Sequence, residues 1–205
     1  MKKRTMIFVT AMVLLFAMVT GTTLAYMTST TATVQNTFTY GNVLITLDEA
    51  PVDSDGQATN GARVTANSYR LFPGKTYDKD PTVHVDAASE DCYIFVKVVN
   101  PISSIEATGD TTIAKQMQDR GWTLVSDKTN VYAYDGKTQG TADATVSKGE
   151  NIKVFETVTI ADDAKFAGTY GQVTIEAFAV QAEGFASAAA AWTAVAGASE
   201  TPTGW

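Results

Sequence analysis

The sequence predicts an all-β protein, an antiparallel jelly-roll-like β-sandwich with two short helical insertions. Short runs rich in threonine, valine, isoleucine and aromatic residues recur along the chain, separated by glycine, asparagine, aspartate and proline. This pattern is typical of β-sandwiches and barrels. Only two segments have helical character. An immunoglobulin-like sandwich is the alternative, although the usual cysteine pair is missing, as it is in many such domains.

The first 25 residues have the features of a secretory signal peptide. The basic residues Lys2–Arg4 precede an apolar run over residues 6–19, and small residues follow up to Ala25. We expect cleavage between Ala25 and Tyr26. A retained anchor is the alternative, but the apolar run is shorter than the roughly 20 residues of a spanning helix. The mature chain is therefore expected to have no membrane span.

Residues 26–205 have the length of one secreted domain. The chain contains 15 basic and 22 acidic residues, a net charge of −7. Removal of Lys2, Lys3 and Arg4 with the signal peptide changes this charge to −10. A nucleic-acid partner is not expected, because a phosphate backbone requires a basic face.

The first strand signals of the mature chain change parity at Gly41-Asn42. Apolar residues occupy mostly even positions over residues 32–40 and odd positions over residues 43–47. Either a two-residue hairpin lies at Gly41-Asn42, or a glycine bulge shifts one long strand by a residue; the bulge is favoured. Residues 50–67 then form a polar loop, and Pro73-Gly74 marks a turn.

The middle of the chain predicts two strands and a helix. Residues 82–86 alternate, and residues 92–100 are apolar on both faces, which indicates a central strand. Residues 111–120 place their apolar side chains on one helical face, and Gly121 is a suitable helix end.

The rest of the chain, from residue 122 onwards, predicts four strands and a second helix. Residues 122–125 and 130–134 resemble a hairpin, and residues 151–160 and 172–181 are two long strands. Residues 185–195 are rich in alanine, which favours a helix.

The sequence lacks the residues of a conventional enzyme. His84 is the only histidine and Cys92 the only cysteine, so a catalytic base has one candidate and a zinc site lacks ligands. We expect His84 to be a structural strand residue and Cys92 a small buried hydrophobic residue. We therefore predict no enzymatic activity and no cofactor.

Acidic residues occur in pairs, which we interpret as solvated loop residues rather than a glycosidase pair. These pairs are Asp78 with Asp80, Glu90 with Asp91, and Asp162 with Asp163. Asp53-Ser54-Asp55-Gly56 begins like a calcium loop, but the twelfth position is Val64 instead of the glutamate of an EF-hand. A looser calcium site formed by Asp53, Asp55 and Asn60 is left as the alternative.

Three stretches carry a resemblance to a known family. They are TLAYMTSTTATVQNTFTYGNVLITL, YRLFPGKTYDKDPTVHV and EDCYIFVKVVN. Together with the late segments AFAVQAEGF and AAAAW, they make the chain similar to Gram-positive proteins exported through the SipW-type alternate signal peptidase. These proteins are relatives of TasA and camelysin, and the match is closest to a clostridial-type subset. Metalloprotease activity described for camelysin relatives is not carried over, because the zinc ligands are missing.

The resemblance implies a jelly-roll domain that is secreted and held at the cell surface or in the biofilm matrix. In fibre-forming relatives, the mature N-terminus is a donor strand that completes the sheet of the next subunit. Within the N-terminal strand segment 26–40, the corresponding residues are Tyr26, Met27, Thr28, Ser29, Thr30, Thr31, Ala32, Thr33 and Val34. The expected partners are the alternate type I signal peptidase during export and further copies of this or a related subunit.

Three functions remain open from the sequence. The favoured function is an exported structural protein, secreted to the cell surface or matrix of a Gram-positive bacterium. The second is a monomeric, adhesin-like binding module with exposed tyrosines such as Tyr132 and Tyr134 as its contact residues. The third and least favoured is a secreted hydrolase that uses His84 or a carboxylate pair. For residues 26–34, a flexible leader or a strand of the chain's own sheet is the alternative to a donor strand.

Overall fold

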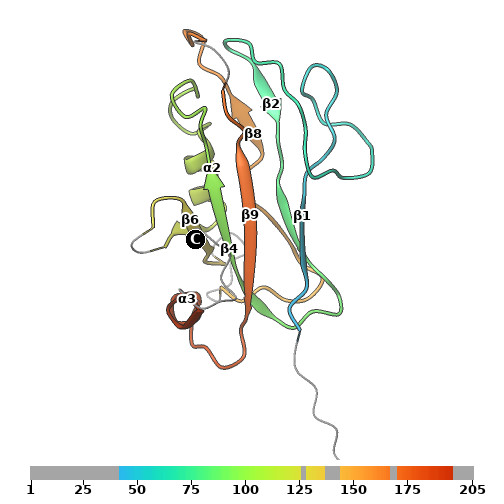
Figure 1. Ribbon diagram of the computed structural model, residues 1–205, viewed down its shortest axis with the longest axis vertical. Helices are drawn as coiled ribbons and strands as arrows, with labels where there is room; N and C mark the ends of the chain where they lie inside the picture. Colours follow the sequence, from blue (N-terminus) through green and yellow to red (C-terminus); the bar gives the residue numbers. More distant parts are fainter. Residues whose placement is uncertain (1–41, 126–127, 137–143, 167–169, 196–205) are drawn as a thin grey trace, which may run out of the picture. The chain divides into compact units, whose positions relative to one another are not determined.

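The computed structural model describes residues 42–125, 128–136, 144–166 and 170–195. The chain divides into two compact units, Met1–Thr39 and Tyr40–Trp205, and all the described residues belong to the second. The named strands pair only in antiparallel fashion, and two short helices accompany them (Figure 1). The prediction of an all-β protein with two short helices is confirmed.

The described strands form three sheets. The first has the order β1-β3-β7, the second β2-β8, and the third β5-β6-β4-β9. The strands are β1 Ile45–Asp48, β2 Thr76–Asp78, β3 Thr82–Val85, β4 Cys92–Val99, β5 Trp122–Leu124, β6 Val131–Tyr134, β7 Asn151–Lys153, β8 Thr157–Thr159 and β9 Thr174–Gln181. The helices of the described residues are α2 Ile113–Asp119 and α3 Ala188–Val195.

Strand β4 is the centre of the fold, as its apolar sequence predicts. It pairs with β6 on one side and with β9 on the other. One face of β4, with Ile94 and Val96, shares a hydrophobic core with Val83 of β3 and Ile152 of β7. The first and third sheets therefore bury apolar faces in the same core.

The opposite face of β4 packs against α3. Tyr93 and Phe95 form a second buried cluster with Ala191 and Trp192. The ring centroids of Phe95 and Trp192 lie 5.0 Å apart, an aromatic contact that adds to area burial. Burial on both sides explains why β4 lacks the alternation of a half-exposed strand.

Helix α2 begins and ends at residues with suitable chemistry. The hydroxyl of Thr112 accepts a hydrogen bond from the Lys115 amide, and the Glu106 carboxylate accepts one from the Ile113 amide at 2.8 Å. These bonds satisfy amides that a helix start leaves without partners. Gly121 follows the helix with φ of 85°, a left-handed conformation that favours glycine.

One predicted strand is wrong in its extent, and one strand was not predicted. The segment 151–160 is split into β7 and β8, which belong to different sheets. Val154 and Phe155, between them, are consecutive and both buried, so the chain turns a corner instead of continuing a two-residue period. Strand β2, with three residues, is too short to show a pattern and depends on pairing with β8.

Stability should depend on the double-sided packing of β4. Ile94 is fully buried, whereas Val99 at the end of β4 is 42% exposed. We expect Ile94→Ala to lower the free energy of unfolding by about 2–5 kcal/mol, because it leaves a cavity. Val99→Ala should lower it by less than about 0.5 kcal/mol. Urea denaturation of both variants tests this, and equal losses would contradict the central role of β4.

Candidate functional site

Strand β1 has an edge without a pairing strand among the described residues. The Asp86 amide donates to the Leu44 carbonyl at 2.9 Å, across the β1–β3 pair. Hydrogen-bonded pairs alternate along an antiparallel ladder, so the backbone N–H and C=O groups of Thr46 and Asp48 also point towards β3. The backbone groups of Val43, Ile45 and Leu47 therefore point away from β3, towards the edge of the sheet.

Strand β9 has an equivalent edge. The Ala182 amide donates to the Asp91 carbonyl at 2.8 Å, next to the β4–β9 pair. By the same alternation, Ile175, Ala177 and Ala179 direct their backbone groups away from β4. In the described part of the chain, β9 pairs only with β4 and is the last strand of its sheet.

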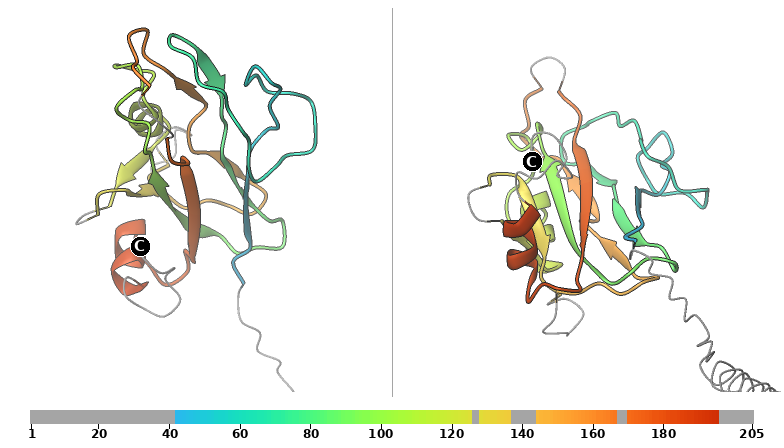
Figure 2. Two further views of the ribbon diagram at one scale, coloured as in Figure 1. Left: turned by 45° about the horizontal axis from the view of Figure 1, so that its top comes forward. Right: turned by 60° about the horizontal axis from the view of Figure 1, so that its bottom comes forward.

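The two edges lie next to one another. Strands β1 and β9 are in contact although they belong to different sheets (Figures 1 and 2). The side chains at their outward-facing backbone positions are apolar and partly buried against the main core. They are Val43, Ile45 and Leu47 on β1 and its approach, and Val173, Ile175, Ala177 and Ala179 on β9 and its approach. The described residues thus leave the core incompletely covered along the junction of the two sheets.

A groove of about 660 Å³ opens where β1 ends and β9 begins. Its apolar wall includes Leu47, Val173 and Ile175, and its polar wall includes Glu49 and Asn67. The groove therefore lies beside two strand edges and exposes both apolar side chains and backbone groups. This combination is suited to bind an extended peptide segment.

One end of the groove carries a buried ion pair. Lys79 Nζ lies 2.6 Å from Glu49 Oε2, and Asn67 Nδ2 donates to Glu49 Oε1 at 3.0 Å. Nearby, the Tyr69 hydroxyl donates to the Asp78 carbonyl at 2.9 Å. Burial and the charge of Glu49 raise the pKa of Tyr69 well above its ordinary value, so this hydroxyl remains a donor.

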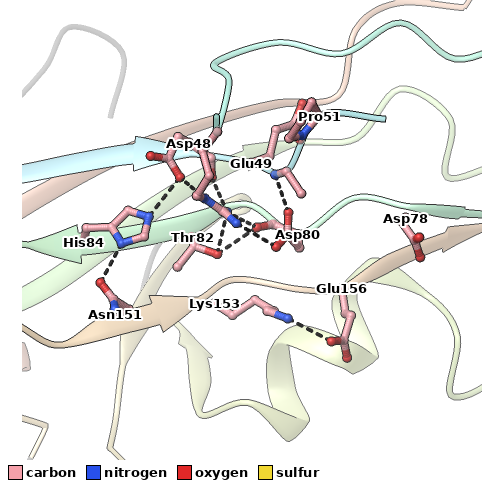
Figure 3. Close-up of polar contacts among 12 residues, drawn as sticks. Asp48, Glu49, Pro51, Asp78, Asp80, Thr82, His84, Asn151, Lys153 and Glu156 are labelled. Atoms are coloured by element: carbon pink, nitrogen blue, oxygen red, sulfur yellow. Dashed lines mark hydrogen bonds and ion pairs between the residues drawn. The ribbon is translucent and has the colours of Figure 1, made fainter. Parts of the chain in front are cut away.

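A polar network on the outer face of the first sheet holds β1 in place (Figure 3). His84 Nε2 lies 2.9 Å from Asp48 Oδ1, and His84 Nδ1 lies 2.5 Å from Asn151 Oδ1. The network thus connects β1, β3 and β7. Neither partner of His84 is a hydroxyl or a thiol, so this arrangement does not form a nucleophile–base pair.

Asp48 is the acidic centre of this network. Partial burial acts to raise the pKa of its carboxyl, but hydrogen bonds and positive charge from Arg63 and His84 outweigh burial and lower it below the ordinary value. The ionised carboxylate is therefore the form that stabilises the end of β1.

The candidate calcium residues do not form a ligand cluster. Asp53 Oδ1 accepts hydrogen bonds from the amides of Asp55 and Gln57, both at 2.9 Å. The Asp55 carboxylate pairs with Lys75 at 3.3 Å, and Asn60 is exposed in the same loop. Across the described ranges, no group of three or more His, Cys, Asp or Glu side chains could hold a metal ion.

The structure also shows the burial of the predicted cysteine and of the two tyrosines that were predicted as contact residues. Cys92 is buried, as predicted, and burial with the charge of Asp91 raises the pKa of its thiol to about 11. Tyr134 is only 3% exposed and belongs to the core, so the hypothesis of Tyr134 as a surface contact is wrong. Tyr132 is half-buried. Aromatic contact between Tyr134 and Trp122 explains the burial, with ring centroids 5.3 Å apart.

The N-terminal predictions concern residues outside the described part. Both cleavage-site residues, Ala25 and Tyr26, and the whole proposed donor segment, residues 26–34, are among them. Among the helices of the described residues, none has the length and apolar character required to cross a membrane.

Sequence reasoning did not find the two edges. Edge position depends on strand order, which the residues of a single strand do not reveal. A weak signal was present in β9, where Ile175, Ala177 and Ala179 are smaller on average than the residues of β4 that they face.

The lowered pKa of Asp48 predicts acid sensitivity. Because the folded-state pKa lies below the unfolded-state value of about 4, the stabilisation is present above that value and is lost as pH falls through the folded-state pKa. Asp48→Asn should cost about 1 kcal/mol of unfolding free energy at pH 7, and the difference from wild type should shrink below pH ~4. Urea denaturation between pH 7 and pH 3 measures this. The control Asp110→Asn, at an exposed position, should match wild type throughout, and a pH-independent cost for Asp48→Asn would contradict the prediction.

Comparison with known proteins identifies no relative. No protein-family model matches the chain, and neither a curated protein nor a solved structure matches it significantly. The resemblance to TasA and camelysin relatives stays a prediction, and the proposals below depend on the geometry of the two strand edges.

Proposed function

We propose that the protein is an exported structural subunit of the cell surface or biofilm matrix, which assembles by strand addition. In this proposal, the described residues form a jelly-roll-like sandwich that lacks one strand at the junction of β1 and β9. The N-terminal strand of a neighbouring subunit supplies it. The observation that carries the proposal is the pair of adjacent open edges, on β1 and β9, beside the groove.

An incoming strand would provide partners for the backbone groups of the two edges and would cover their apolar side chains. It would bond to outward-facing backbone groups, which otherwise form a template for association. It would also cover the partly buried side chains, including Ile45, Leu47 and Ile175, and the burial of their apolar surface is favourable. The present β1–β9 contact includes no strand pairing, so separating the two strands to admit a third breaks no ladder hydrogen bonds.

The segment 26–34, YMTSTTATV, is the proposed donor. It is uncharged and contains neither proline nor glycine, so every residue can donate to a ladder. Nine extended residues span about 30 Å, so the donor is longer than the seven-residue stretch from Val173 to Ala179 that it would cover. Since each subunit would give a strand at one place and receive one at another, the contacts are head to tail and produce a filament unless a ring closes.

Two alternatives lead to monomers. If Gly41-Asn42 forms a hairpin, residues 32–40 of the same chain would occupy the junction beside β1. If the N-terminal segment is a leader, the protein is a monomeric surface-binding module. The burial of Tyr134 removes one of the residues on which that module would depend.

A comparison of two purified proteins tests the donor segment. One begins at Tyr26 and the other at Gln35. We expect only the longer protein to form filaments, seen by negative-stain microscopy, and to elute early in size-exclusion chromatography. The shorter protein should remain monomeric and should regain a higher melting temperature when the peptide YMTSTTATV is added. If both proteins are monomers of equal stability, strand addition is contradicted. If the longer protein has a higher melting temperature that does not depend on protein concentration, the N-terminal strand pairs within its own chain.

A proline at the β9 edge tests the acceptor. The amide of Ala177 points away from β4, so Ala177→Pro removes an edge donor while leaving the β4–β9 ladder intact. We expect the Ala177→Pro variant of the Tyr26 protein to fold, with an unchanged far-ultraviolet circular dichroism spectrum, and to lose filament formation. The matched variant Ala177→Ser retains the amide and should assemble as wild type does. Filaments of normal length from Ala177→Pro would exclude this edge as the acceptor.

A further inference from the structure

We infer that Arg63 is a positioning residue that holds Val64 as a stop at one end of the β1 edge, and that this stop sets the register of the incoming strand. The inference rests on the proposed function, because a register exists only if a strand is added. The residues involved, Arg63 and Val64, lie in the polar loop over residues 50–67, beside the end of β1.

The open edge of β1 ends abruptly at Glu49. Val43, Ile45 and Leu47 have outward-facing backbone groups, and Glu49 is the next position with this orientation. There the edge is occupied, because the Glu49 amide donates to the Val64 carbonyl and the Val64 amide donates to the Glu49 carbonyl, both at 2.8 Å. A strand that pairs with β1 can therefore extend to Leu47 and no further.

Arg63 fastens this stop to the ends of β1 and β3. Its guanidinium contacts the Asp48 carboxylate through Nε and Asp80 Oδ2 through Nη1 at 3.1 Å. Nη2 donates to the carbonyls of Asp48 at 3.2 Å and Asp80 at 3.0 Å, and to Thr82 Oγ1 at 3.1 Å. A planar fork of donors can satisfy such a set, whereas a lysine ammonium cannot. Because Arg63 directly precedes Val64 in the chain, these contacts limit how far Val64 can move from Glu49.

The donor sequence explains why a stop is required. Side chains alternate between the two faces of a strand, so a slip of one residue would exchange faces and is costly. A slip of two residues preserves the faces. In YMTSTTATV, a two-residue shift places threonine on threonine or on serine at several positions, so side chains distinguish these registers poorly. Glu49 lies two residues beyond Leu47, and its outward-facing backbone groups are already bonded to Val64. A donor strand shifted by two residues towards Glu49 therefore finds no free partner there.

The test measures register directly. The chain that begins at Gln35 is mixed with the 15N-labelled peptide YMTSTTATV, and the peptide amides are observed by nuclear magnetic resonance. Wild type should give one set of bound peptide signals. Arg63→Gln should give two or more sets, and the amides of Glu49 and Val64 should exchange with solvent at least about tenfold faster, because the loop opens locally.

A second variant and a control distinguish loss of the Val64 stop from a loss of overall stability. Val64→Pro removes the Val64 amide that bonds to Glu49 and should also produce several sets of peptide signals, with Arg63 unchanged. Arg70→Gln, at an exposed arginine outside the network, should behave as wild type. The amide signals of β4 report whether each variant is folded, and if Arg63→Gln fails to fold, Val64→Pro tests the stop by itself.

The outcomes distinguish the two proposals. One set of bound peptide signals in both Arg63→Gln and Val64→Pro would overturn the stop and leave strand addition standing. No binding of the peptide to wild type would overturn strand addition at this edge, and the stop with it. Several registers in the two variants and one register in wild type and Arg70→Gln are the result that we expect.

Discussion

The burial of β4 on both faces is the constraint on which the rest of this structure depends. Its inner side chains meet the first sheet in the main core, and its outer side chains meet α3. With β6 on one side and β9 on the other, β4 has no exposed edge or face along most of its length. Among the described residues, β9 is then the last strand of its sheet, and their covering of the core ends at the junction with β1.

The junction combines two features that are usually kept apart in soluble proteins. An open strand edge is a hazard for association, which many proteins reduce with charges, bulges or proline. Here the outward-facing positions of both edges bear apolar or small side chains, such as Ile45 and Ala177, that belong to the incompletely covered core. A surface of this kind fits an extended segment better than a rigid globular partner, because backbone hydrogen bonds supply affinity at every second residue.

The polar network beside the junction gives the edge a defined end. Arg63 and His84 hold Asp48, while Lys79 and Asn67 hold Glu49. Strands with repetitive side chains have weakly specified registers, and the proposed threonine-rich donor segment has such side chains. In the proposed assembly, the backbone obstacle at Glu49 and Val64, which is held by charged groups, would supply the register that the donor side chains do not specify.

The sequence by itself determined the all-β class, the central position of β4, the β5–β6 hairpin and both helices, because these depend on local periodicity and on residues such as Gly121. Cys92 was also predicted as a buried residue for this reason. The division of residues 151–160 between two sheets, the burial of Tyr134 and the short strand β2 were decided by packing between distant segments. Strand order determined the two open edges, and the loop folded back through Arg63 determined where one of them ends. Only the tertiary structure decides such features, because they depend on which strands are neighbours, and the pattern within one strand does not encode its neighbours.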